Sequence, residues 1–319
     1  MGRVVEVLDG GLATTIQDQG RPAGPAVGVA PGGVMDAWAA GWANALVGNP
    51  LEAAVLEATL LGPALRFPDG AVVATAGADM GVHVDGVAVP PGHAVRVPPG
   101  GELAAGAARV GARLYLAVDG GIASASWMGS RSVDPAAGFG RALRRGDRLP
   151  LGAAGGPAVW ADAAGTTCLV RDVVRVTEGP SAGGGLVEWL AAGRYHVSVR
   201  SDRVGVRLDP EEVDRQTLPR VWPADWDRHL SMPMVTGAVQ LTPDGTCLVL
   251  MAARGVLGGY PVPAVVAAAD RPVLAQAVPG APLRMVVVSQ EEAREAWARL
   301  QAGAPWRSRE GGGGSRGWK

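Results

Sequence analysis

The amino-acid sequence predicts a mainly β fold with a few short helices, arranged as two tandem domains. A chain of 319 residues is long enough for two units that each bury a core of their own. It contains 48 glycines and 25 prolines, yet 48% of its residues are hydrophobic, so the composition is not that of a disordered chain. Valine-rich runs that are separated by turn residues every few positions are typical of many short strands.

The first domain is expected to cover residues 1–151 as a β-barrel. The pattern predicts strands at 4–8 and 12–16, followed by a long loop at 17–33 that is too rich in glycine and proline for regular structure. The clearest helix is 35–47, because its large apolar residues recur at three- and four-residue spacing. Further strands are predicted between turn signals at 54–60, 64–67, 71–76, 82–84, 94–97, 102–104 and 113–118, and another polar loop at 129–140.

A stretch with little periodicity at 152–168 is typical of a linker, and residues 169–302 are expected to form a second β-barrel domain. Its centre is a buried strand at 247–252 that runs into a turn at Gly258 and Gly259. Glycine has no Cβ and lets a ligand approach the backbone, although a plain hairpin explains the same pattern. The remaining predictions are strands at 173–176, 195–199, 205–208, 235–241 and 283–288, helices at 186–192 and 291–300, a strand or short helix at 272–278, and a disordered tail at 303–319.

Charge and cysteine content argue against several functional classes. With 29 basic and 30 acidic residues and a formal charge of -1, nothing in the charge balance indicates electrostatic attraction to nucleic acid or to an anionic membrane. No apolar run approaches the length of a membrane span and the N-terminus does not look like a signal peptide, so we expect a cytoplasmic protein. Cys168 and Cys247 lack metal-ligand spacing, so we expect no metal site.

Polar residues of the first loop and the first helix allow two interpretations. Gln17, Asp18 and Arg21 could line a site or face solvent, and solvent is the favoured alternative. Asp36 falls in the first turn of the predicted helix, where the helix dipole favours a carboxylate, so a structural cap is its favoured role. The chain contains none of the common hydrolase or phosphate-loop motifs that would identify a nucleophile.

Motifs spread along nearly the whole chain resemble those of one family, in the family's order. They are TTIQDQGRP (14–22), GVAPGGVMD (28–36), ANALVGNP (43–50), VLEATLLGPALRF (55–67), TAGADM (75–80), YLAVDGGI (115–122), GSRS (129–132), GFGRALRRGDRLP (138–150), SDRVGVRL (201–208), GAVQLTPDG (237–245) and GGYP (258–261). The chain therefore resembles the C-type subunit of bacterial 5-oxoprolinase, also called KipA-like or allophanate hydrolase subunit 2, which is related to the carboxyltransferase half of biotin-dependent urea carboxylase.

This resemblance implies two tandem cyclophilin-like β-barrels and a partner chain. The implied partner is the KipI-like, B-type subunit of the same enzyme, with a homo-oligomer as the alternative. The implied hydrolase-type reaction is the ATP-dependent opening of 5-oxoproline to glutamate, or in the urea branch the transfer of a carboxyl group from biotin. ATP or biotin would be needed only if the chain retains this ancestral chemistry.

Three motifs depart from the family pattern. The family usually has PSGAMD where this chain has PGGVMD at 31–36, a glutamate where it has Met232, and ADRQTTGGYP where it has AARGVLGGYP at 252–261. Because polar groups are replaced by Gly, Met, Ala, Val and Leu, and each lost buried hydrogen bond costs about 1–3 kcal/mol, the ancestral chemistry is expected to be weakened. The sequence predicts that positions 32, 232, 253, 256 and 257 enclose a pocket that has become apolar.

Three functions remain open. The first is a working 5-oxoprolinase-type subunit for amide or lactam chemistry on a small carboxylate, which guanidinium groups would hold. The second is a repurposed enzyme that uses an apolar pocket for a cyclisation or rearrangement in secondary metabolism, and the third is a non-catalytic regulatory subunit. The candidate catalytic residues are Asp36, Arg254 and Tyr260, and the candidate substrate-binding residues are Arg21, Arg131, Arg203, Gln240, Met232, Val256, Leu257, Gly258 and Gly259.

Overall fold

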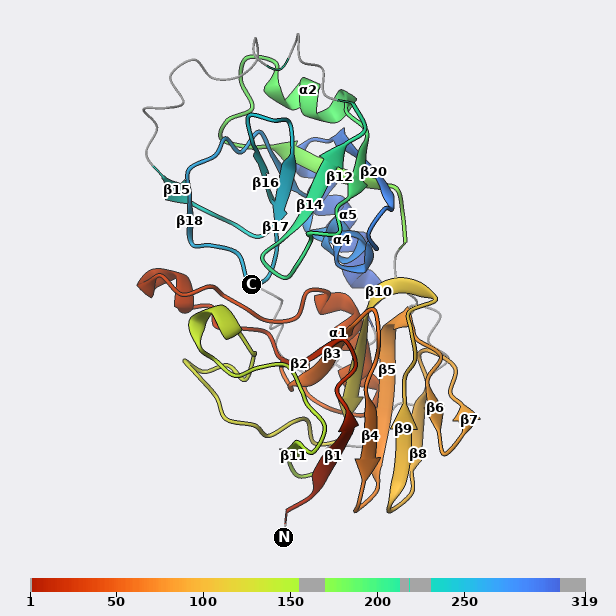
Figure 1. The fold of residues 1–319 in the computed structure, drawn as a ribbon. Coiled ribbons are helices and arrows are strands. Elements are labelled where there is room, and N and C mark those ends of the chain that lie inside the picture. Colours follow the sequence, from red (N-terminus) through yellow and green to blue (C-terminus); the bar gives the residue numbers. More distant parts are fainter. Residues whose placement is uncertain (1, 155–169, 213–217, 219–230, 305–319) are drawn as a thin grey trace.

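A computed structural model describes residues 2–154, 170–212, 218 and 231–304, and it confirms the mainly β fold with few helices. Figure 1 shows two domains, with the N-terminal strands in one and the strands from β12 onward in the other. The described α-helices are α1 (Ala37–Leu46), α2 (Leu186–Ala192), α4 (Arg271–Gln276) and α5 (Gln290–Ala302). The expected linker beyond residue 154 and the expected tail beyond residue 304 lie outside the described residues.

The first domain consists of two antiparallel sheets. One has the strand order β11-β1-β4-β9-β6-β7 and the other β2-β3-β10-β5-β8. The strands are β1 (Val4–Asp9), β2 (Ala13–Gln17), β3 (Val55–Thr59), β4 (Ala64–Phe67), β5 (Ala71–Asp79), β6 (His83–Val84), β7 (Val87–Ala88), β8 (Ala94–Val97), β9 (Gly101–Ala104), β10 (Val110–Val118) and β11 (Arg148–Pro150).

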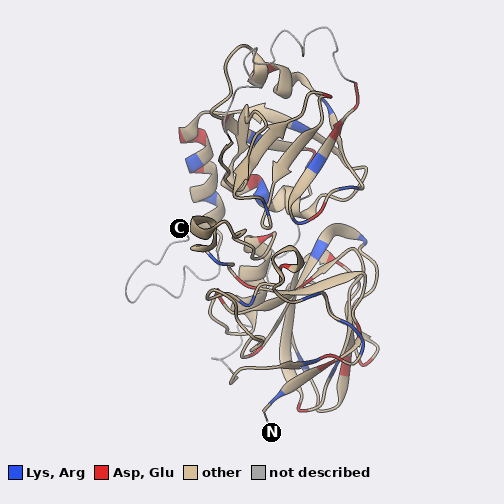
Figure 2. Ribbon diagram, turned by 60° about the vertical axis from the view of Figure 1, so that its left-hand side comes forward, with Lys and Arg blue, Asp and Glu red and all other residues tan. Residues whose placement is uncertain are grey.

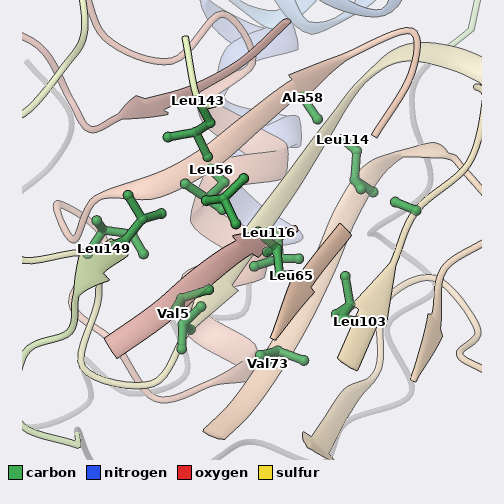
Figure 3. Packing of buried hydrophobic residues seen from close by; sticks show 14 of the residues in the cluster. Val5, Leu56, Ala58, Leu65, Val73, Leu103, Leu114, Leu116, Leu143 and Leu149 are labelled. Carbon is green, nitrogen blue, oxygen red and sulfur yellow. The ribbon is translucent and has the colours of Figure 1, made fainter. Parts of the chain in front are cut away.

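Alternation along β10 explains how its sheet is covered on both faces. Successive side chains of a strand point to opposite faces. Leu114 and Leu116 accordingly join the core between the two sheets, which Figure 3 shows, whereas Tyr115 and Ala117 belong to the cluster around α1. The N-terminal domain therefore places α1 against the outer face of the five-stranded sheet, on the side where the second domain is attached (Figure 1).

The second domain is a closed barrel with the strand order β12-β19-β16-β17-β14-β13-β20. The barrel closes because β12 pairs in parallel with β20. A separate two-stranded ribbon, β15 with β18, lies beside it. The strands are β12 (Val173–Glu178), β13 (Tyr195–Val197), β14 (Gly205–Pro210), β15 (Met232–Pro233), β16 (Ala238–Leu241), β17 (Cys247–Leu250), β18 (Leu257–Gly258), β19 (Ala264–Val266) and β20 (Pro282–Val287).

The structure corrects several predicted elements. Helix α1 begins at Ala37, because Asp36 has an extended backbone and caps the helix, and Met35 instead packs into the core of the second domain. The segment 272–278, predicted as a strand or a short helix, contains α4. The sequence did not predict strands β7, β11, β15, β18 and β19, since they are two or three residues long and too short for a period to be visible.

The C-terminal segment connects the two domains. Helix α4 contacts β10 of the first domain, while α5 packs on β12 and on the 3-10 turn at Ala268–Asp270. Beyond α5, Ala304 is buried in the cluster around α1. Thus α5 packs on the second barrel, and the residues just after it reach the first domain. None of the helices among the described residues is long and apolar enough to cross a membrane.

Candidate functional site

A cavity of about 410 Å³ lies where the two domains meet. This volume falls within the ~300–1,000 Å³ range of small-molecule sites. The first domain contributes the loop before α1 and the start of that helix, and the second contributes the loops after β15 and β17, α4 and α5. The lining residues are Gln19, Pro31, Gly32, Val34, Met35, Ala37, Trp38, Thr236, Met251, Ala252, Ala268, Arg271, Pro272, Trp297 and Gln301.

Two arginines at this cavity lack an acidic partner within the described part of the chain. Arg271 lines the cavity, and its Nε is buried without a hydrogen-bond partner there. Arg254 is 8% exposed and donates from Nε to Oγ1 of Thr236, a lining residue, over 3.2 Å. Burial lowers the pKa of Arg271, and the positive charge of Arg254 lowers it further. Since neither guanidinium forms an ion pair with a described residue, this end of the cavity carries uncompensated positive charge.

A desolvated cation without a counter-ion is costly, and an anionic ligand would remove that cost. The described lining residues include no aspartate, glutamate or histidine, and much of the lining is apolar or an amide. Figure 2 shows acidic and basic residues interspersed over both domains, so the positive charge of the cavity is a local feature. The geometry therefore fits a small molecule with a carboxylate, phosphate or other anionic group.

Asp36 lies beside the cavity, in a buried network that joins the domains, and is not among the lining residues. Its Oδ1 accepts from the backbone N–H of Ala39 over 3.0 Å as a helix cap, and its Oδ2 accepts from Nε2 of Gln276 over 2.9 Å. Gln276 also donates to the carbonyl of Arg113, and its Oε1 accepts from the N–H groups of Ala112 and Arg113. Asp36 thus has the predicted cap role and an unpredicted interdomain role.

Glu57 is the second buried carboxylate of the junction. Its Oε2 accepts from the N–H of Met35 over 2.7 Å and from the hydroxyl of Tyr115 over 2.9 Å. Its Oε1 forms an ion pair with Arg203 of the second domain, which also donates to the carbonyl of Gly33. The candidate substrate-binding residue Arg203 is therefore already neutralised by a carboxylate.

We expect the stability of the protein to fall between about pH 4 and pH 6 because of Asp36. Burial raises the pKa of Asp36 from 3.8 to about 6, and the hydrogen bond from Gln276 opposes this effect. Over this interval the unfolded state loses a proton that the folded state keeps, so the unfolding free energy decreases as pH rises. The decrease is on the order of 3 kcal/mol at 1.36 kcal/mol per pKa unit. Thermal unfolding across this range should show it.

The matched variants for this test are Asp36→Asn and Glu295→Gln. Asparagine cannot ionise, so Asp36→Asn should flatten the pH dependence even though it disturbs the contact with Gln276. Glu295 lies on the exposed surface of α5, so its variant should keep the wild-type slope. An unchanged slope in Asp36→Asn would show that other groups cause the pH dependence.

Gln17, Asp18 and Arg21 of the first long loop are buried, contrary to the favoured prediction that they face solvent. Asp18 fixes this loop. The carboxylate of Asp18 accepts from the hydroxyls of Ser130 and Ser132 and from the N–H groups of Gly20 and Arg131. The candidate Arg131 contacts Asp18 through its backbone N–H, and the residue is exposed. Asp18 therefore ties the two irregular loops of the first domain together.

Arg21, another candidate, is fully buried in the first domain. Its guanidinium lies 4.7 Å from the ring centre of Phe139 and donates to the carbonyl of Ser132. Gly32 separates Arg21 from the cavity, and a Cβ on Gly32 would lie 2.7 Å from Nη1 of Arg21. Gly32 also has φ +64°, which favours glycine. Glycine, in place of the serine that is usual in the family, thus lets the backbone at position 32 lie close to the guanidinium of Arg21.

The predicted apolar pocket is not formed by the five departing positions. Gly32 lines the cavity, but Met232, Ala253, Val256 and Leu257 do not. Met232 pairs with Gly258 in the β15–β18 ribbon, and Leu257 is 63% exposed. The expectation that these five positions enclose one apolar pocket is therefore wrong, because four of them do not line the cavity and two of those four, Met232 and Leu257, belong to a short ribbon outside it.

The remaining candidates lie around the same ribbon. Gln240 is buried and donates weakly to the sulfur of Met234, and a Cβ on Gly258 would lie 2.4 Å from Nε2 of Gln240. Gly258 accordingly makes room for a protein side chain rather than for a ligand. Gly259 is exposed, and Tyr260 is 47% exposed outside the cavity. Of the candidate catalytic residues, Arg254 alone makes a side-chain hydrogen bond to a cavity-lining side chain, and it does so through Thr236.

Sequence reasoning did not identify Thr236, Arg271, Trp297 and Gln301 as site residues. No motif marks them, and they come from three parts of the second domain, the loop after β15, α4 and α5, that meet the first domain only after folding. The one available signal was the face of the C-terminal helix, because Trp297 and Gln301 are four residues apart and lie on the same side of a helix. That signal does not say what the face contacts.

Two β domains that share a cavity with a cationic end define a two-domain protein suited to an anionic small molecule. The family model described as "Carboxyltransferase domain, subdomain A and B" matches residues 27–287, and the chain belongs to this family. Within it the chain is similar to the C subunit of 5-oxoprolinase from Escherichia coli, at 33% identity over 305 residues that cover 92% of this chain and 94% of that protein. The corresponding Haemophilus influenzae protein is 30% identical, covering 91% and 93%.

Solved structures show the same relationship within longer chains. The K. lactis urea amidolyase superposes with a TM-score of 0.83 at 28% identity, over 95% of this chain and 20% of that one. The protein TTHA0988 superposes with a TM-score of 0.79 at 34% identity, over 89% of this chain and 56% of that one. This chain thus corresponds to about a fifth and about half of these two proteins.

Proposed function

We propose that the chain acts as the C-type component of a 5-oxoprolinase-like enzyme, and that the interdomain cavity holds a small carboxylate during cleavage of an amide or lactam bond. The observation that carries this proposal is the uncompensated charge of Arg271 and Arg254. A guanidinium binds a carboxylate with charge-assisted hydrogen bonds. The substrate's own carboxylate would supply the missing counter-ion.

The composition of the cavity supports the need for a partner chain. Cleavage of an amide or lactam requires a nucleophile and a group that transfers protons. Among the described lining residues only Arg271 is ionisable, and a guanidinium stays protonated. The cavity wall of this chain therefore suits binding and orientation, and a KipI-like, B-type partner would contribute the reacting groups. Asp36 and Tyr260 have no part in this proposal, since neither lines the cavity.

ATP and biotin fit this cavity differently. The described lining offers no carboxylate that could hold the magnesium ion of ATP, so we do not expect ATP to bind in this cavity. Biotin, the carrier of a carboxyl group in the urea branch, fits better. Trp297 and Met251 offer apolar surface for its ring system, and Arg271 offers charge for an anionic carboxyl group. The repurposed cyclase receives no support, because the apolar pocket that motivated it is not formed.

Reconstitution tests the proposal. The full chain is combined with a KipI-like partner, and conversion of 5-oxoproline to glutamate is measured with and without ATP. We expect turnover only when ATP and both chains are present. Formation of a stable complex without turnover would reject the catalytic proposal and favour the non-catalytic regulatory alternative.

A further inference from the structure

Helix α5 forms one wall of the cavity while burying little of its own surface. Its only buried residues are Ala296 and Gln301, and its side chains at 297 and 301 both line the cavity. Most of the helix is exposed, as expected for an element that packs on the barrel along one narrow face. The wall that α5 presents therefore consists of one indole and one primary carboxamide.

The carboxamide of Gln301 has no hydrogen-bond partner in the described part of the chain. Gln301 is 7% exposed, and none of the described residues forms a hydrogen bond with its side chain. Its Oε1 and Nε2 are not among the fully buried side-chain atoms that lack a partner, so the amide is accessible from the cavity that it lines. Gln276 provides the contrast within the same chain, because its amide is 1% exposed and makes four hydrogen bonds that join the domains.

We propose that Gln301 is a substrate-reading residue whose carboxamide recognises the adjacent N–H and C=O groups of a lactam or ureido ring, while Arg271 holds the carboxylate. The proposal rests on the proposed function, since it concerns the same cavity. A carboxamide has a donor and an acceptor side by side, which matches the acceptor and donor of a cyclic amide. The two residues come from different helices that line one cavity, so each can contact a different part of one ligand.

The arrangement predicts selectivity between rings of the same size. 5-Oxoproline has both a carboxylate and a lactam, whereas cyclopentanecarboxylate keeps the carboxylate and the ring but lacks the lactam. A site whose side chains hydrogen-bond the polar groups of a substrate binds an analogue that lacks those groups more weakly. The wild-type chain should therefore bind 5-oxoproline more tightly, and this preference should depend on Gln301.

Calorimetric titration of the full chain in complex with its KipI-like partner tests this inference, with Gln301→Met, Arg271→Met and the exposed control Arg299→Met. Gln301→Met should weaken 5-oxoproline roughly 10- to 100-fold, the effect of one or two lost hydrogen bonds, and leave cyclopentanecarboxylate unchanged. Arg271→Met should weaken both ligands, and Arg299→Met neither. Since no described residue hydrogen-bonds the Gln301 side chain, Gln301→Met should also keep or raise the melting temperature.

The outcomes separate the inference from the proposed function. If Arg271→Met weakens both ligands but Gln301→Met changes neither, the anion site stands and the role of Gln301 is rejected. If Gln301→Met lowers the melting temperature, Gln301 is a structural residue. Failure of the wild-type complex to bind either ligand would reject both the inference and the proposed function.

Discussion

Replacing Arg271 with methionine is expected to weaken binding of a carboxylate substrate by about 10- to 150-fold, the equivalent of one lost hydrogen bond to a charged group. Methionine is similar in length and apolar, so it fills the space beside Pro272 and Trp297 without a new polar group. The loss should appear in the dissociation constant of 5-oxoproline and in KM of the reconstituted enzyme.

The same substitution should make the free protein more stable. Arg271 is desolvated, lies close to the like charge of Arg254 and has an Nε without a partner among the described residues, so its removal relieves an unfavourable interaction. A residue that improves binding at a cost in stability is typical of a functional site. Arg299→Met on the exposed surface of α5 is the control, and it should change neither property. A variant that is less stable and binds normally would contradict an anion-binding role for Arg271.

Replacing Glu57 with glutamine is expected to destabilise the protein by about 3–5 kcal/mol, the cost of breaking a buried ion pair by removing one partner. Glu57 accepts from three groups, the N–H of Met35, the hydroxyl of Tyr115 and the guanidinium of Arg203. Glutamine offers one oxygen in place of two and leaves Arg203 without a counter-ion. Thermal unfolding should show a decrease of several degrees.

An exposed ion pair of the same domain supplies the matched control. Arg66 and Glu102 lie 2.6 Å apart with both side chains about half exposed, and such pairs contribute about 0–1 kcal/mol. Glu102→Gln should therefore have little effect. The double variant Glu57→Gln, Arg203→Met removes the stranded cation and should recover part of the lost stability. Equal losses in Glu57→Gln and Glu102→Gln would show that the junction does not depend on this pair.

Local patterns predicted most of the fold. The alternation and turn residues of the first domain are visible over short stretches, so β4 (Ala64–Phe67) and β8 (Ala94–Val97) have the predicted bounds, as does α2 (Leu186–Ala192). The family, too, followed from motifs along the chain and is confirmed by the comparisons. The bounds of these elements depend on residues that are close in sequence, and the family assignment depends on whole motifs.

The candidate site was predicted less well, for a physical reason. Leu257 and Met232 were expected in a pocket because they replace polar residues, yet substitution shows only what changed and not where the side chain points. Arg203 was expected to hold a substrate, but whether an arginine is free or neutralised depends on the distant Glu57. Residue type alone does not reveal a counter-ion 146 positions away in the chain.

The sequence by itself determined that this protein is a two-domain, mainly β member of its family, because strand periodicity, turn chemistry and motif order are local properties. Only the tertiary structure decided that the cavity lies between the domains, with α5 as one wall, and that Nε of Arg271 and the amide of Gln301 have no partner there among the described residues. Burial and hydrogen bonding at such a junction are set by elements that are far apart in sequence and meet only when the chain is folded.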